Sequence, residues 1–207
     1  LDAGEADFLE PLATVVMGLR KLRVKALENV VVIGAGTMGM VNALTLRAYG
    51  CRVMITELMD NKLAKAKALG FDTVDTKTQD PVEAVSRWTQ GVGADAVVMA
   101  VGSTVANDQA FKMLKHMDGR ILYFAANYPA PALNIDSNAV HYKRMELIGT
   151  IGADRVDFHV AARLLNTGAV KVTELIEPTF YRLNEAQAAF ERAASPDAYR
   201  VCIRTAE

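Results

Sequence analysis

Residues 28–50 read ENVVVIGAGTMGMVNALTLRAYG, and this stretch decides the fold of the chain. It opens with four β-branched residues at 30–33, a pattern typical of a buried parallel strand. Glycines follow with the G-x-G-x-x-G spacing, and apolar residues then recur at helical intervals until Gly50. The stretch therefore predicts a strand, a glycine-rich turn and a helix that stops at Gly50.

Each glycine of this turn has a mechanical role that indicates a dinucleotide. Gly34 permits the tight turn out of the strand, Gly36 lets a pyrophosphate approach the main chain, and Gly39 allows helix and strand to pack closely. The free N–H groups at the start of the helix then face the phosphates, and the helix dipole favours their negative charge.

A second apolar strand at residues 52–56 ends in Glu57, about twenty residues beyond the turn, where a carboxylate meets the adenine-ribose hydroxyls. A solvated acid at a strand end is the alternative interpretation of Glu57. No arginine stands immediately after it, and an acid here repels a ribose 2′-phosphate. The sequence therefore favours NAD over NADP.

The composition excludes several function classes. The chain has 207 residues, 51% hydrophobic and 23% charged, with a net charge of -1, so no basic field indicates nucleic acid or an anionic membrane. No apolar run approaches the ~20 residues that span a bilayer. The two cysteines, Cys51 and Cys202, are too few for a disulfide framework, and we expect buried thiols in a reducing, cytoplasmic setting.

Strands and helices alternate along the chain, which predicts an α/β fold with a doubly wound, parallel, six-stranded sheet. The six expected strands lie at residues 30–33, 52–56, 71–74, 96–101, 121–125 and 146–149. Such a sheet binds its ligand outside the carboxyl ends of its strands. The residues expected there are Gly36, Thr37, Met38, Glu57, Val101, Gly102, Ser103, Phe124, Ala125, Ala126, Thr150 and Ile151.

Several motifs in this order resemble the zinc-dependent medium-chain alcohol and polyol dehydrogenases, with sorbitol and threonine dehydrogenases nearest in character. They are FLEPLA at 8–13, VVVIGAGTMG at 30–39, GVGAD at 91–95, TELI at 173–176, NEA at 184–186 and AFE at 189–191. The resemblance covers essentially all of the chain.

The resemblance implies roles for individual residues. Gly34, Gly36 and Gly39 match the phosphate-turn glycines, Thr37 and Met38 lie along the pyrophosphate, and Glu57 binds the adenine ribose. Lys62 matches a basic residue near the same ribose, with a plain surface lysine as the alternative. Glu10 matches a glutamate beneath the catalytic zinc; the alternative is an acid stabilised at a helix N-terminus. The usual Val-Gly-Leu loop reads Phe124-Ala125-Ala126 here, and the methyl of Ala125 is expected to narrow the nicotinamide site.

The chain also departs from the family pattern. The Cys and Gly-His-Glu element that holds the catalytic zinc, and the four-cysteine structural site, do not occur. We expect His116, His141 and His159 to be surface or satisfied core histidines. Glu10 alone provides too few ligands to bind zinc. The first residue is not Met. We therefore expect a piece of a longer protein: residues 1–26 form a connecting helix from a missing catalytic domain, 27–152 a Rossmann NAD-binding domain, and 153–207 a C-terminal segment that returns to that catalytic domain.

The implied chemistry of the complete parent enzyme is hydride transfer from a secondary alcohol or polyol to NAD, with zinc polarising the alkoxide. This chain alone is expected to bind cofactor without turnover. The alternatives are a free-standing NAD-binding sensor or interaction module, and a zinc-free quinone-reductase-like relative that uses NADPH, which Glu57 disfavours. A Cys and a Gly-His-Glu element upstream of Leu1 would favour the enzyme.

The edges of the sheet suggest how the chain associates. A homodimer or tetramer through the edge strand at 146–149 is expected. The extended piece near Ile176 and the final strand are expected to pair with each other or with another copy, or to fray. The basic stretch at 20–25 is interpreted as a solvated helix end rather than a binding patch.

Overall fold

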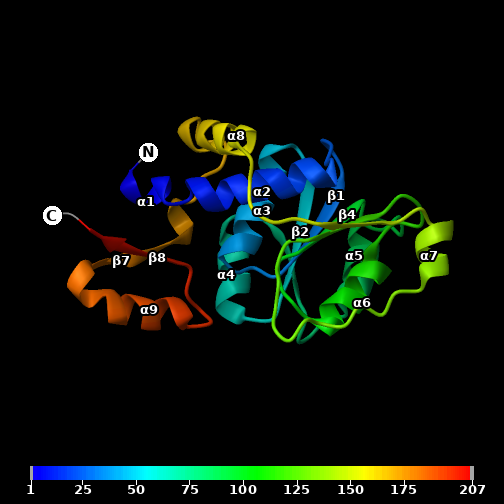
Figure 1. Ribbon diagram of the computed structural model, residues 1–207. Coiled ribbons are helices and arrows are strands. Elements are labelled where there is room, and N and C mark those ends of the chain that lie inside the picture. Colours follow the sequence, from blue (N-terminus) through cyan, green and yellow to red (C-terminus); the bar gives the residue numbers. More distant parts are fainter. Residues whose placement is uncertain (1, 206–207) are drawn as a thin grey trace.

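The computed structural model describes residues 2–205, and its centre is a six-stranded parallel sheet (Figure 1). The strands are β1 (Asn29–Ile33), β2 (Arg52–Glu57), β3 (Asp72–Asp75), β4 (Ala96–Met99), β5 (Arg120–Tyr123) and β6 (Glu146–Gly149). Their order is β3-β2-β1-β4-β5-β6, and every neighbouring pair is parallel. The predicted doubly wound fold is confirmed, and its order reverses between β1 and β4, where such sheets bind ligands.

Helices cover both faces of the sheet, and each face has its own core. The helices are α1 (Ala3–Ala6), α2 (Leu9–Leu22), α3 (Thr37–Ala48), α4 (Asp60–Ala68), α5 (Pro81–Trp88), α6 (Thr104–Met113), α7 (Ser137–Tyr142), α8 (Arg155–Asn166) and α9 (Ala186–Ala194). Val30 and Val32 of β1 pack in one core with α2, α3 and α8, whereas Val31 and Ile33 pack in the other with α5 and α6. Successive strand residues point to opposite faces, so β1 is apolar on both sides, as a central parallel strand must be.

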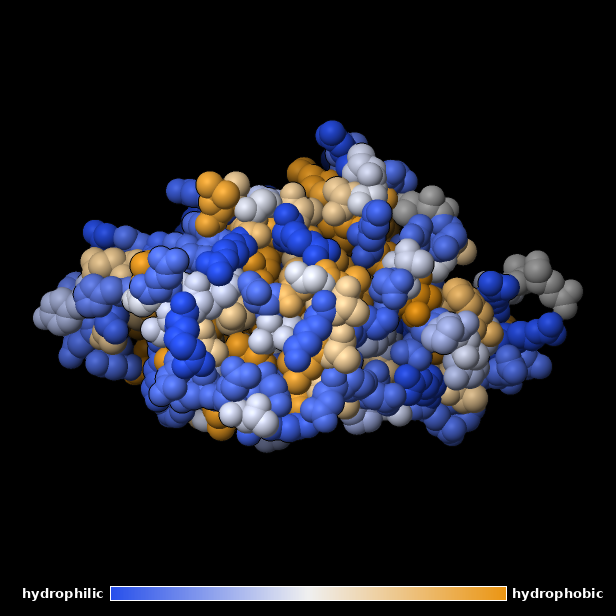
Figure 2. Space-filling view, turned by 180° about the vertical axis from the view of Figure 1, so that it is seen from behind, coloured by the Kyte–Doolittle hydropathy of each residue, from blue (hydrophilic) through white to orange (hydrophobic). Residues whose placement is uncertain are grey.

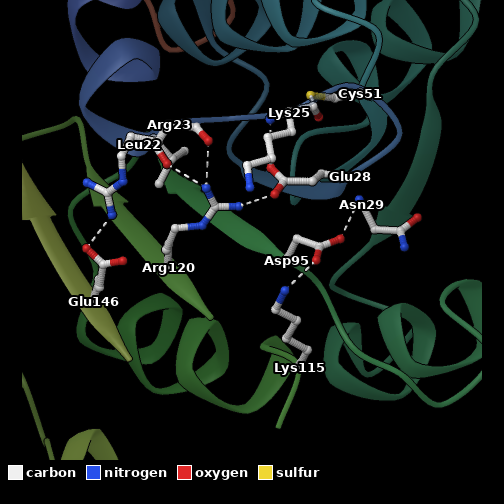
Figure 3. Close-up of polar contacts among 10 residues, drawn as sticks. All are labelled: Leu22, Arg23, Lys25, Glu28, Asn29, Cys51, Asp95, Lys115, Arg120 and Glu146. Atoms are coloured by element: carbon white, nitrogen blue, oxygen red, sulfur yellow. Dashed lines mark hydrogen bonds and ion pairs between the residues drawn. The ribbon is translucent and has the colours of Figure 1, made fainter. Parts of the chain in front are cut away.

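A buried arginine joins the end of α2 to the sheet (Figure 3). The Arg120 guanidinium donates to the carbonyl oxygens of Leu22 at 2.7 Å and Arg23 at 2.9 Å, and it pairs with Glu28 at 2.6 Å. The Arg120 and Glu28 side chains are only 9% and 14% exposed. Carbonyls at a helix C-terminus lack intrahelical donors and carry partial negative charge, so a cation here satisfies both needs.

Asp95 makes a second link at the same amino-terminal edge of the strands (Figure 3). Its carboxylate accepts a hydrogen bond from the Asn29 amide at 2.9 Å and pairs with Lys115 Nζ at 2.7 Å. The polar groups of this edge are therefore matched to one another, on the side of the sheet away from the carboxyl ends.

The basic stretch at the end of α2 bonds to later parts of the chain. Arg20 pairs with Asp154 and Asp157, Arg23 pairs with Glu146, and Lys21 donates to the Gly149 carbonyl. Burial alone would raise the pKa of Asp157, but the hydrogen bonds from Arg20 and from the Asp154 amide outweigh it and hold that pKa below its usual range. The Arg20 side chain is still 51% exposed, so the stretch is a solvated helix end that also holds α8 and β6.

The C-terminal segment forms a second, two-stranded sheet. β7 (Ile176–Arg182) pairs in parallel with β8 (Arg200–Arg204), which is one of the arrangements expected from the sequence. Short 3-10 turns, Thr173–Leu175 and Leu183–Glu185, flank β7. The segment packs beside α1, since a Cβ on Gly4 would lie 3.1 Å from Ile176 Cδ1, and both chain ends lie on this side of the molecule (Figure 1).

Both cysteines are free and buried, as expected. Burial and the nearby Glu28 raise the pKa of the Cys51 thiol to about 11, and its Sγ lies 3.3 Å from the Lys25 carbonyl oxygen. On the face seen in Figure 2, apolar side chains show as separate patches among hydrophilic ones. Among the described residues, no helix combines the length and apolar character required to cross a bilayer.

Candidate cofactor-binding crevice

The turn between β1 and α3 is packed so closely that two of its glycines admit no side chain. Gly34 has φ +101°, and a Cβ there would lie 2.5 Å from Val101 Cγ1. A Cβ on Gly39 would lie 1.9 Å from the Gly34 carbonyl oxygen. Gly36 differs, because the nearest atom to a Cβ placed on it would be Lys62 Nζ, at 3.7 Å. The protein itself requires glycine at 34 and 39, and it leaves open space beside Gly36.

The first turn of α3 presents free hydrogen-bond donors to that space. Gly36 is the N-cap residue and makes no side-chain cap. The amides of Gly36, Thr37 and Met38 donate to no other described residue, whereas Met40 N donates to the Gly36 carbonyl at 2.9 Å. Such amides at a helix start form an anion site, and the ammonium of Lys62 lies beside it.

Glu57 holds the turn from the end of β2. Its Oε2 accepts from the Ala35 amide at 2.7 Å, and its Oε1 accepts from the amides of Leu58 at 2.6 Å and Met59 at 2.9 Å. Glu57 is therefore not simply a solvated acid at a strand end. A carboxylate has about four acceptor positions, so one remains for a further donor.

Two cavities flank the turn. The first, of about 410 Å³, is lined by Ile33, Gly34, Thr56, Glu57, Leu58, Thr76, Val101, Ser103, Val105, Ala106 and Gln109. The second, of about 380 Å³, is lined by Glu10, Pro11, Thr14, Met38, Phe124, Ala126, Thr150, Ile151, Gly152 and Arg200. Both lie at the carboxyl ends of the strands, one beyond β1, β2 and β4 and the other beyond β5 and β6. Their sizes fall within the usual range of small-molecule sites.

Most of the residues singled out in the sequence lie in this crevice. Gly34, Glu57 and Val101 line the first cavity, Glu10, Met38, Ala126, Thr150 and Ile151 line the second, and Gly36, Thr37, Gly39 and Lys62 belong to or adjoin the turn between them. Gly102 lines neither, and its carbonyl accepts from Asn127 Nδ2 at 3.0 Å.

Ala125 also lines neither cavity, and its amide donates to the Met99 carbonyl at 3.0 Å. The narrowing of the nicotinamide site by the Ala125 methyl group stays a prediction, and the neighbouring residues Phe124 and Ala126 line the second cavity.

Several lining residues could not be predicted from the sequence. Leu58 follows β2, Thr76 follows β3, and Gln109 lies on α6. Leucine, threonine and glutamine are common at such positions, so their residue types do not indicate a site. Arg200 comes from the distant strand β8 and brings a cation to the cavity that contains Glu10. The Thr150 hydroxyl oxygen is buried and has no partner among the described residues.

Residues 2–205 do not by themselves fit a zinc ion. No three His, Cys, Asp or Glu side chains in this part of the chain are placed to hold a metal. Glu10 is exposed at the cavity wall, and His116, His141 and His159 are all on the surface. Zinc in proteins needs at least three ligands, so any site that used Glu10 would need donors from elsewhere.

Comparison with known proteins shows which proteins this chain is similar to. Residues 37–167 match a family model described as zinc-binding dehydrogenase. The chain is similar to sorbitol dehydrogenase of Halalkalibacterium halodurans, at 29% identity over 98% of this chain and 59% of that enzyme. It is 31% identical to sorbitol dehydrogenase 1 of Saccharomyces cerevisiae, over 90% of this chain and 54% of that enzyme.

Solved structures share the fold. 2R,3R-butanediol dehydrogenase from Bacillus subtilis matches with a TM-score of 0.88 at 23% identity, over 100% of this chain and 59% of that one. A Sinorhizobium meliloti 1021 protein bound to NADP matches with a TM-score of 0.89, also at 23% identity, over 99% and 60%. The chain spans about half to three fifths of the length of the relatives it matches. Because the family model matches more than half of its residues, the chain belongs to the zinc-binding dehydrogenase family of medium-chain oxidoreductases.

Proposed function

We propose that this chain is the NAD-binding part of a zinc-dependent alcohol or polyol dehydrogenase. One observation carries the proposal: the free amides at the start of α3 and the carboxylate of Glu57 lie at the same turn, and a cavity opens on each side of that turn. A dinucleotide site needs hydrogen-bond donors for the pyrophosphate and, next to them, an acid for the ribose hydroxyls.

NAD fits this arrangement piece by piece. The pyrophosphate would lie on the amides of Gly36, Thr37 and Met38, with Lys62 adding positive charge. The adenosine would occupy the cavity that contains Glu57, whose free acceptor position suits a ribose hydroxyl. The nicotinamide would occupy the cavity between Met38 and Ile151. The bound cofactor would supply the hydride acceptor, and these residues would orient it.

The rest of the reaction belongs to the complete enzyme. Relatives named sorbitol dehydrogenase suggest a secondary alcohol or polyol as substrate. In our proposal, residues 1–26 connect to a catalytic domain, residues 27–152 bind the cofactor, and residues 153–207 return to the catalytic domain. Glu10 would contribute to a zinc site there, so this chain alone would bind NAD without oxidising a polyol.

Titration of the purified chain with NAD and NADP tests the proposal. We expect saturable NAD binding, weaker NADP binding, and no reduction of NAD when zinc and a panel of polyols are added. Glu57→Gln should weaken NAD about 10- to 100-fold, because bonds to a charged group are worth about 1.5–3 kcal/mol. It should also bring the NAD and NADP affinities closer together.

Asp75→Asn is the matched control, since Asp75 stands opposite Glu57 at the end of β3 but lines neither cavity. It should leave NAD affinity within about twofold, less than the loss of one ordinary hydrogen bond. Absence of NAD binding, or tighter binding of NADP, would overturn the cofactor proposal.

We also propose that the chain forms a homodimer, or a tetramer built from it, through β6. This strand ends the sheet, and residues 146, 147 and 149 are exposed, with Leu147 38% exposed. An apolar residue on an open edge favours pairing with a second copy about a two-fold axis.

Leu147→Lys should separate the copies, because a two-fold axis at the strand would bring the two added charges close together. Like charges in an interface cost several kcal/mol, so the dissociation constant should rise about 100-fold or more in sedimentation experiments. Val92→Lys adds the same charge at an exposed turn and should change nothing. A wild-type chain that stays monomeric at high concentration would refute the association.

A further inference from the structure

The C-terminal segment reaches the phosphate turn through one side chain, Tyr199. Its hydroxyl donates to the Ala35 carbonyl at 3.1 Å, across 164 positions of sequence. A carbonyl oxygen only accepts, so the phenol must keep its proton. Burial, with the charges of Glu57 and Glu177, raises the pKa of Tyr199 to about 12, and the hydroxyl therefore stays a donor at neutral pH.

This bond fixes the peptide plane that carries the Gly36 amide. In a trans peptide the C=O and the N–H point in opposite directions. When Tyr199 holds the Ala35 carbonyl on one side, the Gly36 N–H of the same plane is turned to the other. The preceding peptide is held separately, because the Ala35 amide donates to Glu57 at 2.7 Å.

The turn needs such a restraint because glycine does not supply one. Gly36 lacks a Cβ, so the peptide between residues 35 and 36 can rotate with little steric cost. The side of Gly36 where a Cβ would lie is open, since the nearest atom there is Lys62 Nζ at 3.7 Å. Without Tyr199, the Ala35 carbonyl could turn toward the bound phosphates and repel them.

Tyr199 is itself held in place by a charged pair in the C-terminal segment. Its amide donates to Glu177 Oε1 at 2.9 Å, and Arg192 binds Glu177 Oε2 at 2.9 Å and 3.1 Å. Arg192 lies on α9 and Glu177 on β7. The chain of contacts thus runs from α9 and β7 through Tyr199 to the phosphate turn.

We propose that Tyr199 is a positioning residue that orients the Gly36 amide for the cofactor pyrophosphate, and so makes phosphate binding depend on the C-terminal segment. This inference rests on the proposed NAD site. It concerns ligands that contain the pyrophosphate, and it does not concern the adenosine half, which Glu57 and its cavity hold.

Tyr199→Phe removes only the hydroxyl and keeps the ring that packs against the core. The 207-residue chain and this variant should be titrated with NAD, ADP-ribose and adenosine, followed by amide chemical shifts. NAD and ADP-ribose should bind about 3- to 10-fold more weakly to the variant, the value of one hydrogen bond, and adenosine should bind equally to both. The Gly36 amide resonance should shift in the free variant.

Tyr181→Phe is the matched control, because Tyr181 lies half-buried on β7 and its hydroxyl bonds to no described residue. It should bind all three ligands like the wild type. Equal loss of adenosine and ADP-ribose in Tyr199→Phe would indicate general structural damage and overturn the positioning role. Unchanged NAD affinity would overturn that role but leave the proposed function standing, whereas a wild-type chain that binds no NAD would overturn both.

Discussion

Replacing Gly39 with alanine is expected to remove detectable NAD binding and to lower the free energy of unfolding by about 1–3 kcal/mol, the usual cost of overpacking. The new Cβ would lie 1.9 Å from the Gly34 carbonyl oxygen. Both groups belong to main chain rather than to a flexible side chain, so α3 must move away from β1. A displacement of about 1 Å breaks hydrogen bonds of normal length, and losing two bonds to phosphate weakens binding about 100-fold or more.

Two companion substitutions separate the cofactor from the fold. Gly36→Ala should preserve stability, because its Cβ meets only Lys62 Nζ at 3.7 Å, but it should weaken NAD strongly by occupying the space of the pyrophosphate. Gly149→Ala, with nothing within 4 Å of the added Cβ, should change neither property. Chemical denaturation and NAD titration measure both effects, and a Gly36→Ala chain with unchanged NAD affinity would contradict the expected position of the phosphates.

Arg120→Met is expected to destabilise the chain by about 3–5 kcal/mol, the usual cost of removing one partner of a buried ion pair. Glu28, 14% exposed, would lose its ion-pair partner and keep the Lys25 amide as a donor, and the carbonyls of Leu22 and Arg23 would lose the Arg120 donor. The urea denaturation midpoint measures the loss, and NAD affinity should not change, because Arg120 lies at the amino-terminal edge of the sheet.

The control for Arg120 is an exposed pair of the same chemistry. Arg144 and Asp118 are 65% and 56% exposed, so Arg144→Met should cost only about 0–1 kcal/mol. The double variant of Arg120→Met with Glu28→Gln should be more stable than Arg120→Met alone, because it removes the unpaired charge. Equal midpoints for Arg120→Met and Arg144→Met would refute the expected contribution of the buried pair.

The sheet could be predicted from sequence because its signals are local. The expected strand at 146–149 coincides with β6, and the strand expected at 30–33 lies within β1. Boundaries set by tertiary contacts could not be predicted. The strand expected at 96–101 ends at Met99, and the strand expected at 121–125 ends at Tyr123.

The site divides in the same way. Gly34, Gly39 and Glu57 were expected at the turn because strand, glycine and acid spacings determine where they lie, and the structure places them there. No local sequence pattern marks Tyr199 or Arg200 as a site residue. Tyr199 reaches Ala35, and Arg200 reaches the second cavity, only because the C-terminal segment folds back onto the large sheet.

The small sheet of β7 and β8 also has a consequence for how the molecule opens. A sheet of only two strands is at best marginally stable by itself in water, so it stays folded only through its contacts with the rest of the protein. The supports include Glu5 of α1, which accepts from Thr173 at 2.7 Å, the bond from Arg200 to the Asp7 carbonyl at 3.0 Å, and the bond from Tyr199 to the Ala35 carbonyl. This region should form the least protected cooperative unit, with amides that exchange hydrogen while the large sheet stays closed.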